Sequence, residues 1–366
     1  MKMNFFDFRE KHIIIDIGTR YTKALSLEGK DSEKSFDIDY SIEDSSFEFN
    51  FLPLQECKIT DEENFLEVLR LAYSKLKTME KNVFVTIPDH AVIIRLITIK
   101  EEEFSKAKND DDVRNLVLKK LKPTLPISID RWFFDLQEVE NSGNSKLFLV
   151  EAILRNNLFE IEKNIRRLGL NPIGVDINSF NTVNVFSNYL SSENKRDKNI
   201  SIVCMNHKST TIMVFRNGNL RTAQTRLIGG YDFARKLSEE KNISFKDGED
   251  ILRNETVFLP ELSEEQDNIK NYSILKPVFS ELVTSLFNMF EYYSETFKES
   301  EIHEIIITGG FSNLKNIHSH LSSRLNIKVN RGSDIISIKQ KKGSVISSEK
   351  INMLLPALGS AIREES

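Results

Sequence analysis

Residues 12–23 read H-I-I-I-D-I-G-T-R-Y-T-K, and this stretch decides the fold of the 366-residue chain. The β-branched run around Asp16 predicts a short buried strand, and Gly18 marks a tight turn. Residues 22–28 then alternate polar and apolar side chains, so a second strand follows the turn directly. P-loop and dinucleotide-binding motifs instead join a strand to a helix, and neither motif occurs at such a junction in this chain.

The turn after the first predicted strand has the chemistry of a phosphate site. Gly18 lets the backbone approach a ligand closely, and successive turn N–H groups form a concave anion site. Asp16 is placed to hold Mg²⁺ directly or through water, and Lys23 reaches a phosphate as a point charge. An ordinary glycine hairpin explains the same residues, so both interpretations stay open for this motif alone.

Two later segments place paired glycines where a strand ends. They are Ile228-Gly229-Gly230 and Thr308-Gly309-Gly310-Phe311. Each pair is expected to open a helix, and the N-terminus of a helix favours anions. A tight strand-to-helix turn without any ligand is the alternative interpretation of both pairs.

Composition and charge exclude several classes of protein. Hydrophobic residues make up 40% of the chain and charged residues 29%, which is typical of a globular protein. A formal charge of -5 gives no reason to expect nucleic acid as a partner. Cys57 and Cys204 cannot form a disulfide framework or a thiolate metal cluster at their spacing. No signal peptide and no apolar run of about 20 residues is evident, so we expect a cytoplasmic protein that does not cross a membrane.

The remaining pattern predicts two related lobes and a block between them. Each half begins with a strand pair and later returns to a strand and a helix, which suits two lobes facing a cleft. Residues 255–276 are expected to be a polar connection, and residues 330–350 a basic loop. The predicted domain limits are 1–89 for the first lobe, 90–170 for an α+β block, and 171–366 for the remainder of the core.

The order and spacing of these segments resemble the actin-like ATPase superfamily. The set consists of D-I-G-T-R-Y-T-K (16–23), R-L-I-G-G-Y-D-F (226–233), I-I-I-T-G-G-F (305–311) and L-P-A-L-G-S-A-I-R (355–363). Between them, V-T-I-P-D-H-A-V-I-I-R and L-P-I-S-I-D-R-W-F-F-D narrow the resemblance to the PilM family of type IV pilus assembly proteins. In that family, as in FtsA, this block is a small inserted subdomain.

The resemblance implies a fold, a cofactor and a set of site residues. The fold would be an α/β, actin-like, two-lobed ATPase fold with ribonuclease H-like halves and the inserted α+β subdomain. ATP with Mg²⁺ would lie in the cleft, with Asp16 toward the metal, and Gly359 would be the small residue of the closing helix near the hinge. The cofactor-binding residues carried over from the family are Asp16, Gly18, Thr19, Lys23, Gly229, Gly230, Glu249, Arg253, Gly309, Gly310 and Phe311.

One segment departs from the family pattern. The second phosphate motif should read Asp-x-Gly after a strand, and alignment on Thr211 sets Met205 at the aspartate and His207 at the glycine. Met205 offers no hard oxygen for Mg²⁺ or for an attacking water. We therefore expect that this protein binds ATP, as the resemblance implies, but hydrolyses it weakly or not at all.

Three functions remain after this reading. The first is a PilM-like scaffold, cytoplasmic at the inner face of the inner membrane, which binds the N-terminal peptide of a single-span PilN-like partner. The second is an FtsA-like division protein, although that family ends in a linker and a membrane helix, whereas Arg363–Ser366 directly follow the closing helix here. The third is a sugar- or acetate-kinase-type phosphotransferase, which needs the second phosphate motif. Membrane association is expected to be indirect, and self-association is left open.

Overall fold

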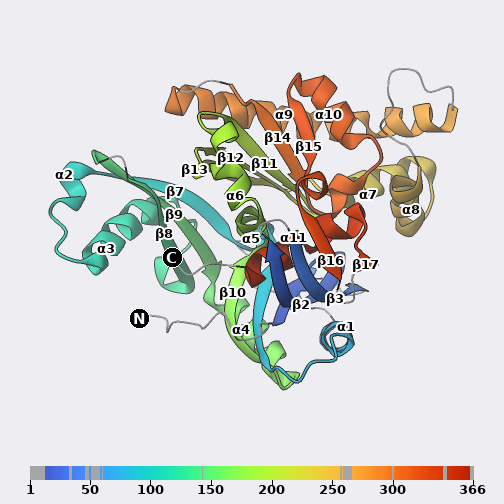
Figure 1. The fold of residues 1–366 in the computed structure, drawn as a ribbon, viewed down its shortest axis with the longest axis horizontal. Helices are drawn as coiled ribbons and strands as arrows, with labels where there is room; N and C mark the ends of the chain where they lie inside the picture. Colours follow the sequence, from blue (N-terminus) through green and yellow to red (C-terminus); the bar gives the residue numbers. More distant parts are fainter. Residues whose placement is uncertain are drawn as a thin grey trace.

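Two β-sheets with the same pattern of strand pairing form the framework of the molecule (Figure 1). They are seen in a computed structural model that describes residues 13–32, 35–45, 49–50, 58–59, 61–141, 143–255, 258, 266–298, 301–340 and 344–362. In each sheet, a central strand pairs antiparallel with the strand that follows it and parallel with a strand later in the chain. The predicted division into two related lobes agrees with this duplication.

The first sheet is built on the predicted strand pair. Its central strand is buried at all five positions, which is why its sequence is a continuous apolar and β-branched run around Asp16. The order along the sheet is β10-β6-β1-β2-β3-β16-β17. These strands are β1 (Ile13–Ile17), β2 (Tyr21–Ser32), β3 (Ser35–Asp44), β6 (Asn82–Ile87), β10 (Asn171–Ile177), β16 (Ser337–Gln340) and β17 (Ser344–Val345).

The second sheet repeats the pairing pattern of the first with five strands. Its order is β13-β12-β11-β14-β15, and its two central strands, β11 and β14, are fully buried. The strands are β11 (Asn199–Met205), β12 (Thr210–Arg216), β13 (Asn219–Arg226), β14 (Glu304–Thr308) and β15 (Lys328–Arg331). A small separate pair, β4 (Phe49–Asn50) and β5 (Lys58–Ile59), lies outside both sheets.

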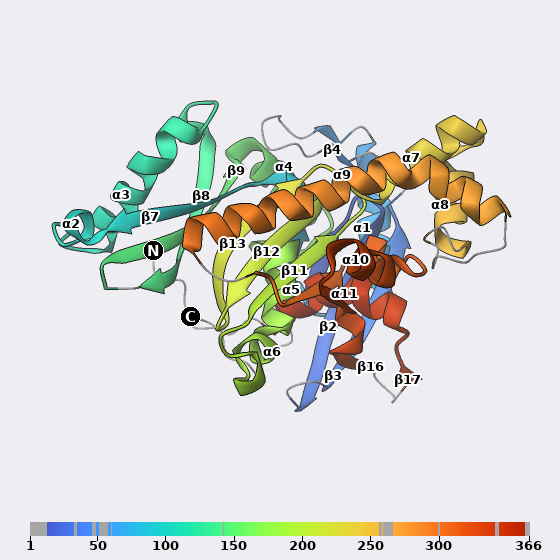
Figure 2. The same ribbon diagram turned by 90° about the horizontal axis from the view of Figure 1, so that it is seen from above.

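Helices fill the space between the sheets and cover their outer faces. Helices α5 (Asn178–Val185) and α11 (Ser348–Ala361) lie between the sheets, and one face of β11 joins their core. The other face of β11 packs in a second core with α7 (Gly230–Lys241), α9 (Gln266–Phe297) and α10 (Ile317–Leu325). Figure 2 shows α9 running along the outer face of this sheet. The first sheet is covered on its outer side by α1 (Glu62–Lys75) and α4 (Arg155–Arg167).

Local signals set several helix ends as the sequence predicts. The Asp61 side chain accepts a hydrogen bond from the backbone N–H of Asn64 and so caps α1. Gly169 follows α4 with φ +73°, a left-handed conformation that glycine adopts without steric cost. Helix α1 ends at Lys75.

The inserted block has a core of its own. It is a three-stranded antiparallel sheet in the order β7-β9-β8, and Trp132 is fully buried in the core beneath α3. In Figure 1 the block projects to one side of the two sheets. An ion pair between Glu140 and Arg221 of β13 ties it to the second lobe. Its elements are β7 (Ile93–Lys100), α2 (Glu101–Phe104), α3 (Asp110–Leu121), β8 (Trp132–Asn141) and β9 (Ser145–Leu154).

The expected polar connection over residues 255–276 is wrong in its second half. Helix α9 begins at Gln266, because Asn268, Asn271 and Leu275 continue its buried stripe toward the N-terminus. Asn271 accepts a hydrogen bond from Lys241 and donates one to Glu255, so its buried amide is satisfied. Pro277 lies inside the helix, where it removes one backbone donor and its ring crowds the carbonyl of the preceding turn.

The expected loop over residues 330–350 is also corrected. The chain returns to the first sheet there, because β16 pairs in parallel with β3 and in antiparallel with β17. Ile336 and Ile338 are buried two residues apart, the spacing of one face of a strand, and the basic residues around them conceal this alternation. Lys341 and Lys342 lie outside the described residues.

A buried ionic cluster fastens the edge of the second sheet. Glu304, only 4% exposed, accepts a hydrogen bond from Tyr189 at 2.7 Å and also contacts Lys195 and Asn330. Burial raises the pKa of Glu304, but the bonds from Lys195 and Tyr189 outweigh it, so the pKa lies below its ordinary value. A lowered carboxylate pKa stabilises the fold at neutral pH and ceases to do so as the pH falls through the folded pKa.

We therefore expect Glu304→Gln to lower the free energy of unfolding by about 2 kcal/mol at pH 7. The difference from the wild type should shrink as the pH falls below the ordinary carboxylate pKa of about 4.3, because the folded pKa lies lower still. Urea denaturation at several pH values measures it, with exposed Glu301→Gln as the matched control. A difference that does not change with pH would contradict the ionic role of Glu304.

Candidate functional site

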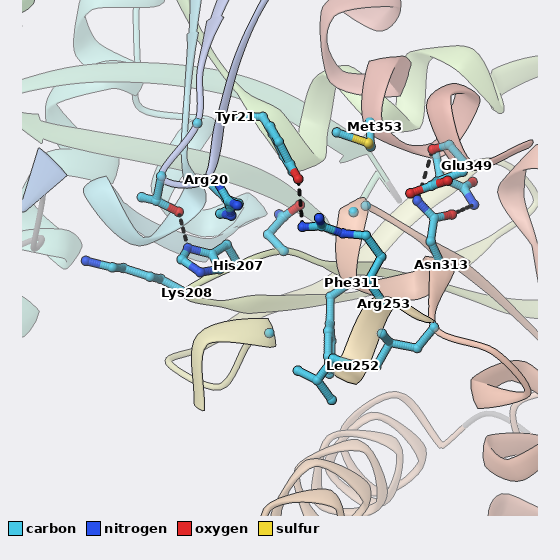
Figure 3. A pocket seen from close by; sticks show the side chains of 18 of the residues that line it. Arg20, Tyr21, His207, Lys208, Leu252, Arg253, Phe311, Asn313, Glu349 and Met353 are labelled. Carbon is cyan, nitrogen blue, oxygen red and sulfur yellow. Dashed lines mark hydrogen bonds between the residues drawn. The ribbon is translucent and has the colours of Figure 1, made fainter. Parts of the chain in front are cut away.

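A cavity of about 430 Å³ lies where the turns of the two sheets meet. Its walls come from the β1–β2 turn, the β11–β12 turn, helix α8 (Phe245–Asn254), the turn after β14 and the start of α11 (Figure 3). Asp16 and Gly229 are the two predicted site residues that do not line it. The others line the cavity: Gly18, Thr19, Lys23, Gly230, Glu249, Arg253, Gly309, Gly310 and Phe311.

Lys23, just after the β1–β2 turn, lines the cavity, and its positive charge is paired with the buried carboxylate of Asp16. Asp16 is fully buried, and its Oδ2 lies 2.5 Å from Lys23 Nζ. Its other oxygen accepts a hydrogen bond of 3.3 Å from Asn178. A Cβ on Gly18 would lie 2.3 Å from the carbonyl oxygen of Tyr21, so only glycine fits this turn. Lys23 therefore lines the cavity while Asp16 holds it in place.

The geometry does not form a magnesium site from protein ligands alone. Both oxygens of Asp16 are engaged, one by Lys23 and one by Asn178. Among the described residues, no three His, Cys, Asp or Glu side chains come together as a metal-binding group. A direct contact of Asp16 with Mg²⁺ would require it to give up one of these two partners, and the metal role of Asp16 stays a prediction.

The strand register corrects the alignment of the second turn by one residue. In the first hairpin, Ile17 pairs with Thr22 across the turn. In the second hairpin, Met205 pairs with Thr210, so Met205 corresponds to Ile17. The sequence comparison was anchored on Thr211, one residue too far along the strand.

In the corrected register, Cys204 stands at the position of Asp16, and Asn206 stands at the position of Gly18. Burial raises the pKa of the Cys204 thiol to about 12, with a contribution from the negative charge of Asp89. Thr308 Oγ1 donates a hydrogen bond to its sulfur at 3.2 Å. The second turn therefore has a neutral thiol where a carboxylate was expected.

The N-terminus of α7 is already occupied by protein groups. The N–H of Gly230 donates to Asn206 O at 3.1 Å, and the N–H of Tyr231 donates to His207 O at 2.7 Å. A Cβ on Gly229 would lie 2.4 Å from His207 O, so this glycine is required by the packing of α7 on the second turn. The expected anion site at this helix N-terminus is wrong, because its donors are used internally.

The Gly309-Gly310 turn also differs from the expectation of a helix start. A short 3-10 segment, η5 (Gly310–Asn313), follows it, and α10 begins only at Ile317. Gly309 has φ +85°, and a Cβ there would lie 2.4 Å from Met205 O. A Cβ on Gly310 would instead meet nothing closer than 3.8 Å, so this residue leaves open space in the cavity wall.

Helix α8 reaches across the cavity to the first turn. Glu249 Oε1 lies 2.8 Å from Arg20 Nε and 3.6 Å from His207 Nε2. Burial raises the pKa of Glu249, but His207 and the charge of Arg20 outweigh it, so the pKa lies below its ordinary value. One turn later, Arg253 donates to the hydroxyl of Tyr21 at 2.9 Å, the bond drawn in Figure 3.

Two further residues of the site were missed by sequence reasoning. Asp89 and His90 follow β6 and are almost wholly buried between the lobes. Burial raises the pKa of Asp89, and burial together with the nearby charge of Lys208 lowers the pKa of His90 to about 4. The signal for both was available, because polar residues at the carboxyl end of a strand parallel to β1 lie beside the first turn.

Comparison with known proteins agrees with this architecture. A family model described as type IV pilus assembly protein PilM matches residues 14–365. A solved PilM-PilN type IV pilus biogenesis complex contains a similar chain, with TM-score 0.78, 16% identity, and coverage of 97% of this chain and 98% of that one. No curated protein sequence matches the chain significantly.

More distant solved structures share the fold. The ethanolamine utilization protein EutJ from Carboxydothermus hydrogenoformans has TM-score 0.53 and 11% identity, over 96% of this chain and 89% of that one. MreB 5 of Spiroplasma citri bound to AMPPNP has TM-score 0.50 and 11% identity, over 97% and 96%. The predicted actin-like α/β fold is confirmed. Every helix in the described part of the chain is too short or too polar to cross a bilayer.

Proposed function

This chain belongs to the PilM family of type IV pilus assembly proteins, and we propose that it is a non-enzymatic scaffold of a type IV pilus or a related secretion machine. The observation that carries the proposal is the agreement over the whole chain, from the family match at residues 14–365 to the fold shared with a PilM-PilN complex. Its place would be the cytoplasmic face of the inner membrane, reached through a membrane partner.

The proposed partner is a single-span PilN-like protein, bound through its short N-terminal cytoplasmic peptide. Support comes from the similar chain being solved in a PilM-PilN complex. On this chain, one exposed aromatic side chain lies on β8 of the inserted block and another on α4. Phe133 is 49% exposed and Phe159 61% exposed, and the guanidinium of Arg155 lies 6.0 Å from the Phe133 ring. An exposed aromatic pair beside a cation suits a peptide with apolar anchors.

We expect Phe133→Ser combined with Phe159→Ser to weaken peptide binding by about tenfold or more, since two apolar contacts are lost. The probe is a fluorescein-labelled peptide covering the N-terminal cytoplasmic residues of the source organism's PilN-like protein, and anisotropy measures its affinity. Tyr292→Ser is the matched control, because Tyr292 is also an exposed aromatic residue, 55% exposed, but lies on α9 of the second lobe. Equal affinity of the double variant and the control would remove this surface from the proposal.

We further propose that ATP binds in the cavity between the lobes and is hydrolysed weakly or not at all. The volume of about 430 Å³ suits a ligand of nucleotide size, and Lys23 supplies a cation beside the glycine turns. A related actin-like protein, MreB 5 of Spiroplasma citri, was solved bound to AMPPNP. The neutral thiol of Cys204 and the amide of Asn206 leave the second turn without a carboxylate to orient water.

Gly310→Leu tests the nucleotide site without disturbing the fold. A Cβ at Gly310 meets only Met353 at 3.8 Å, so a leucine side chain would extend into the cavity itself. We expect the affinity for a fluorescent ATP analogue to fall about tenfold or more, whereas Gly310→Ala should bind nearly as the wild type. Phosphate release is measured in the same samples and is expected to stay at the background rate.

Either of two results would contradict the nucleotide proposal. One is a wild-type protein that is folded but binds no ATP analogue. The other is a Gly310→Leu variant that binds as tightly as the wild type, which would place the nucleotide elsewhere. Steady phosphate release by the wild type would leave binding intact but overturn the expectation of weak hydrolysis.

A further inference from the structure

The two lobes contact each other through side chains at the mouth of the cavity. Thr19 Oγ1 of the first turn lies 3.3 Å from His207 Nδ1 of the second turn, within hydrogen-bond distance. Two contacts from α8 add to this one: an ion pair between Arg20 and Glu249 at 2.8 Å, and a hydrogen bond that Arg253 donates to the hydroxyl of Tyr21. Figure 3 shows Arg20 and Tyr21 of the first lobe facing His207 and Arg253. We call these contacts the outer tier.

A second set of contacts lies deeper and is buried. Asn206 Nδ2 donates to Asp89 Oδ2 at 3.3 Å, while the other oxygen of Asp89 accepts the backbone N–H of Ser179 at 2.9 Å. His90 Nδ1 lies 3.4 Å from Ser209 Oγ of the second turn. These contacts, the inner tier, join the end of β6 and the start of α5 to the β11–β12 turn.

Each tier includes side-chain contacts from the second turn, residues 206–209. Asn206 and His207 have side chains that reach the other lobe, whereas Gly18, the counterpart of Asn206, has none. The carbonyls of the same two residues hold the N-terminus of α7. The second turn is therefore fixed to its own lobe by backbone and to the opposite lobe by side chains.

From these contacts we infer that the chain carries its own latch, which holds the two lobes closed without nucleotide. A ligand shifts a conformational equilibrium only by its difference in affinity for the two states. If the closed state is already dominant, a bound nucleotide changes the population little. The closed cleft is then a constant feature of this scaffold, and a partner that binds across the lobes meets one geometry whatever the nucleotide supply.

The latch rests on inter-lobe contacts and stands whether or not ATP binds. The test measures the distance between spin labels at Ser74→Cys on α1 and Glu239→Cys on α7, both exposed and on opposite lobes. Cys57→Ser removes the second cysteine of the chain, and Cys204 is buried. Pulsed electron paramagnetic resonance is recorded without nucleotide, with Mg-ATP, and for Asn206→Ala combined with His207→Ala. Lys246→Ala, exposed on α8, is the matched control.

We expect one narrow distance for the nucleotide-free protein, unchanged by Mg-ATP and by the control substitution. The double variant should shift roughly half or more of the pairs to longer distances. Its backbone carbonyls still hold α7, and an unchanged far-ultraviolet circular dichroism spectrum verifies that it is folded. A broad nucleotide-free distribution that narrows only with Mg-ATP would overturn the latch, and so would a folded double variant with the wild-type distance. Calorimetric titration of ATP on the same wild-type sample separates this outcome from failure of the nucleotide proposal.

Discussion

Replacing Gly359 by alanine is expected to lower the free energy of unfolding by about 3 kcal/mol or more. A Cβ at this position would lie 1.7 Å from the carbonyl oxygen of Asn181, so α11 and α5 could no longer pack at their present separation. In an ordinary helix the same change would stabilise by roughly 0.5–1 kcal/mol, because alanine is the better helix former. The packing between the two sheets thus reverses the sign of the effect.

Denaturation by urea measures the change, and Ser348→Ala on the exposed first turn of α11 is the control. The loss should appear as a lower transition midpoint with an unchanged slope. A Gly359→Ala variant as stable as the wild type would show that α5 and α11 can move apart without loss of stability. It would also contradict the expectation that a small residue is required at position 359 near the hinge.

The second large effect is expected from the buried pair in the first turn. Asp16→Asn leaves the ammonium of Lys23, only 8% exposed, without a carboxylate partner. Removal of one partner of a buried pair costs about 3–5 kcal/mol, because the remaining charge stays desolvated. Among substitutions that conserve side-chain size, Asp16→Asn should therefore be one of the most destabilising in the chain.

A double-mutant cycle with Lys23→Met isolates the interaction. The variant that carries both changes should be more stable than the sum of the two single losses predicts, by about 1–3 kcal/mol. Thermal or urea denaturation of the four proteins provides the data. Additive losses would mean that the two charges do not stabilise each other, in conflict with their separation of 2.5 Å.

Local signals allowed much of the fold to be predicted. The buried run in β1, the cap at Asp61 and the left-handed Gly169 each depend on neighbouring residues, and the structure has all three. The start of α9 was missed because its N-terminal half is polar and contains Pro277, and its helical state depends on buried contacts such as those of Asn271. Pairing of β16 with β3 was missed because it joins segments some 300 residues apart, roughly the whole length of the chain.

The sequence allowed most residues that line the cavity to be predicted, but not the hydrogen bonds and ion pairs among them. The glycines at 18 and 309 can be recognised from residue type, because close backbone approach at Gly18 and positive φ at Gly309 require glycine. The pairing of Cys204 with Thr211 is known only from the strand register of the structure. The alignment by sequence was shifted by one residue and therefore set Met205, not Cys204, at the aspartate position. The contacts of Asp89 and His207 join the two lobes, and no local pattern encodes contacts between segments that are brought together only by folding.

The return of β16 to the first sheet has a consequence for synthesis on the ribosome. The first sheet lacks its β16 and β17 strands until residues 337–345 have been translated, because these strands pair beside β3. Throughout translation of the second lobe, the edge of β3 is therefore without its eventual neighbour, and an open strand edge is a site for pairing with other chains. Domains usually fold in order as the chain emerges, but here the lobe that is begun first is completed last.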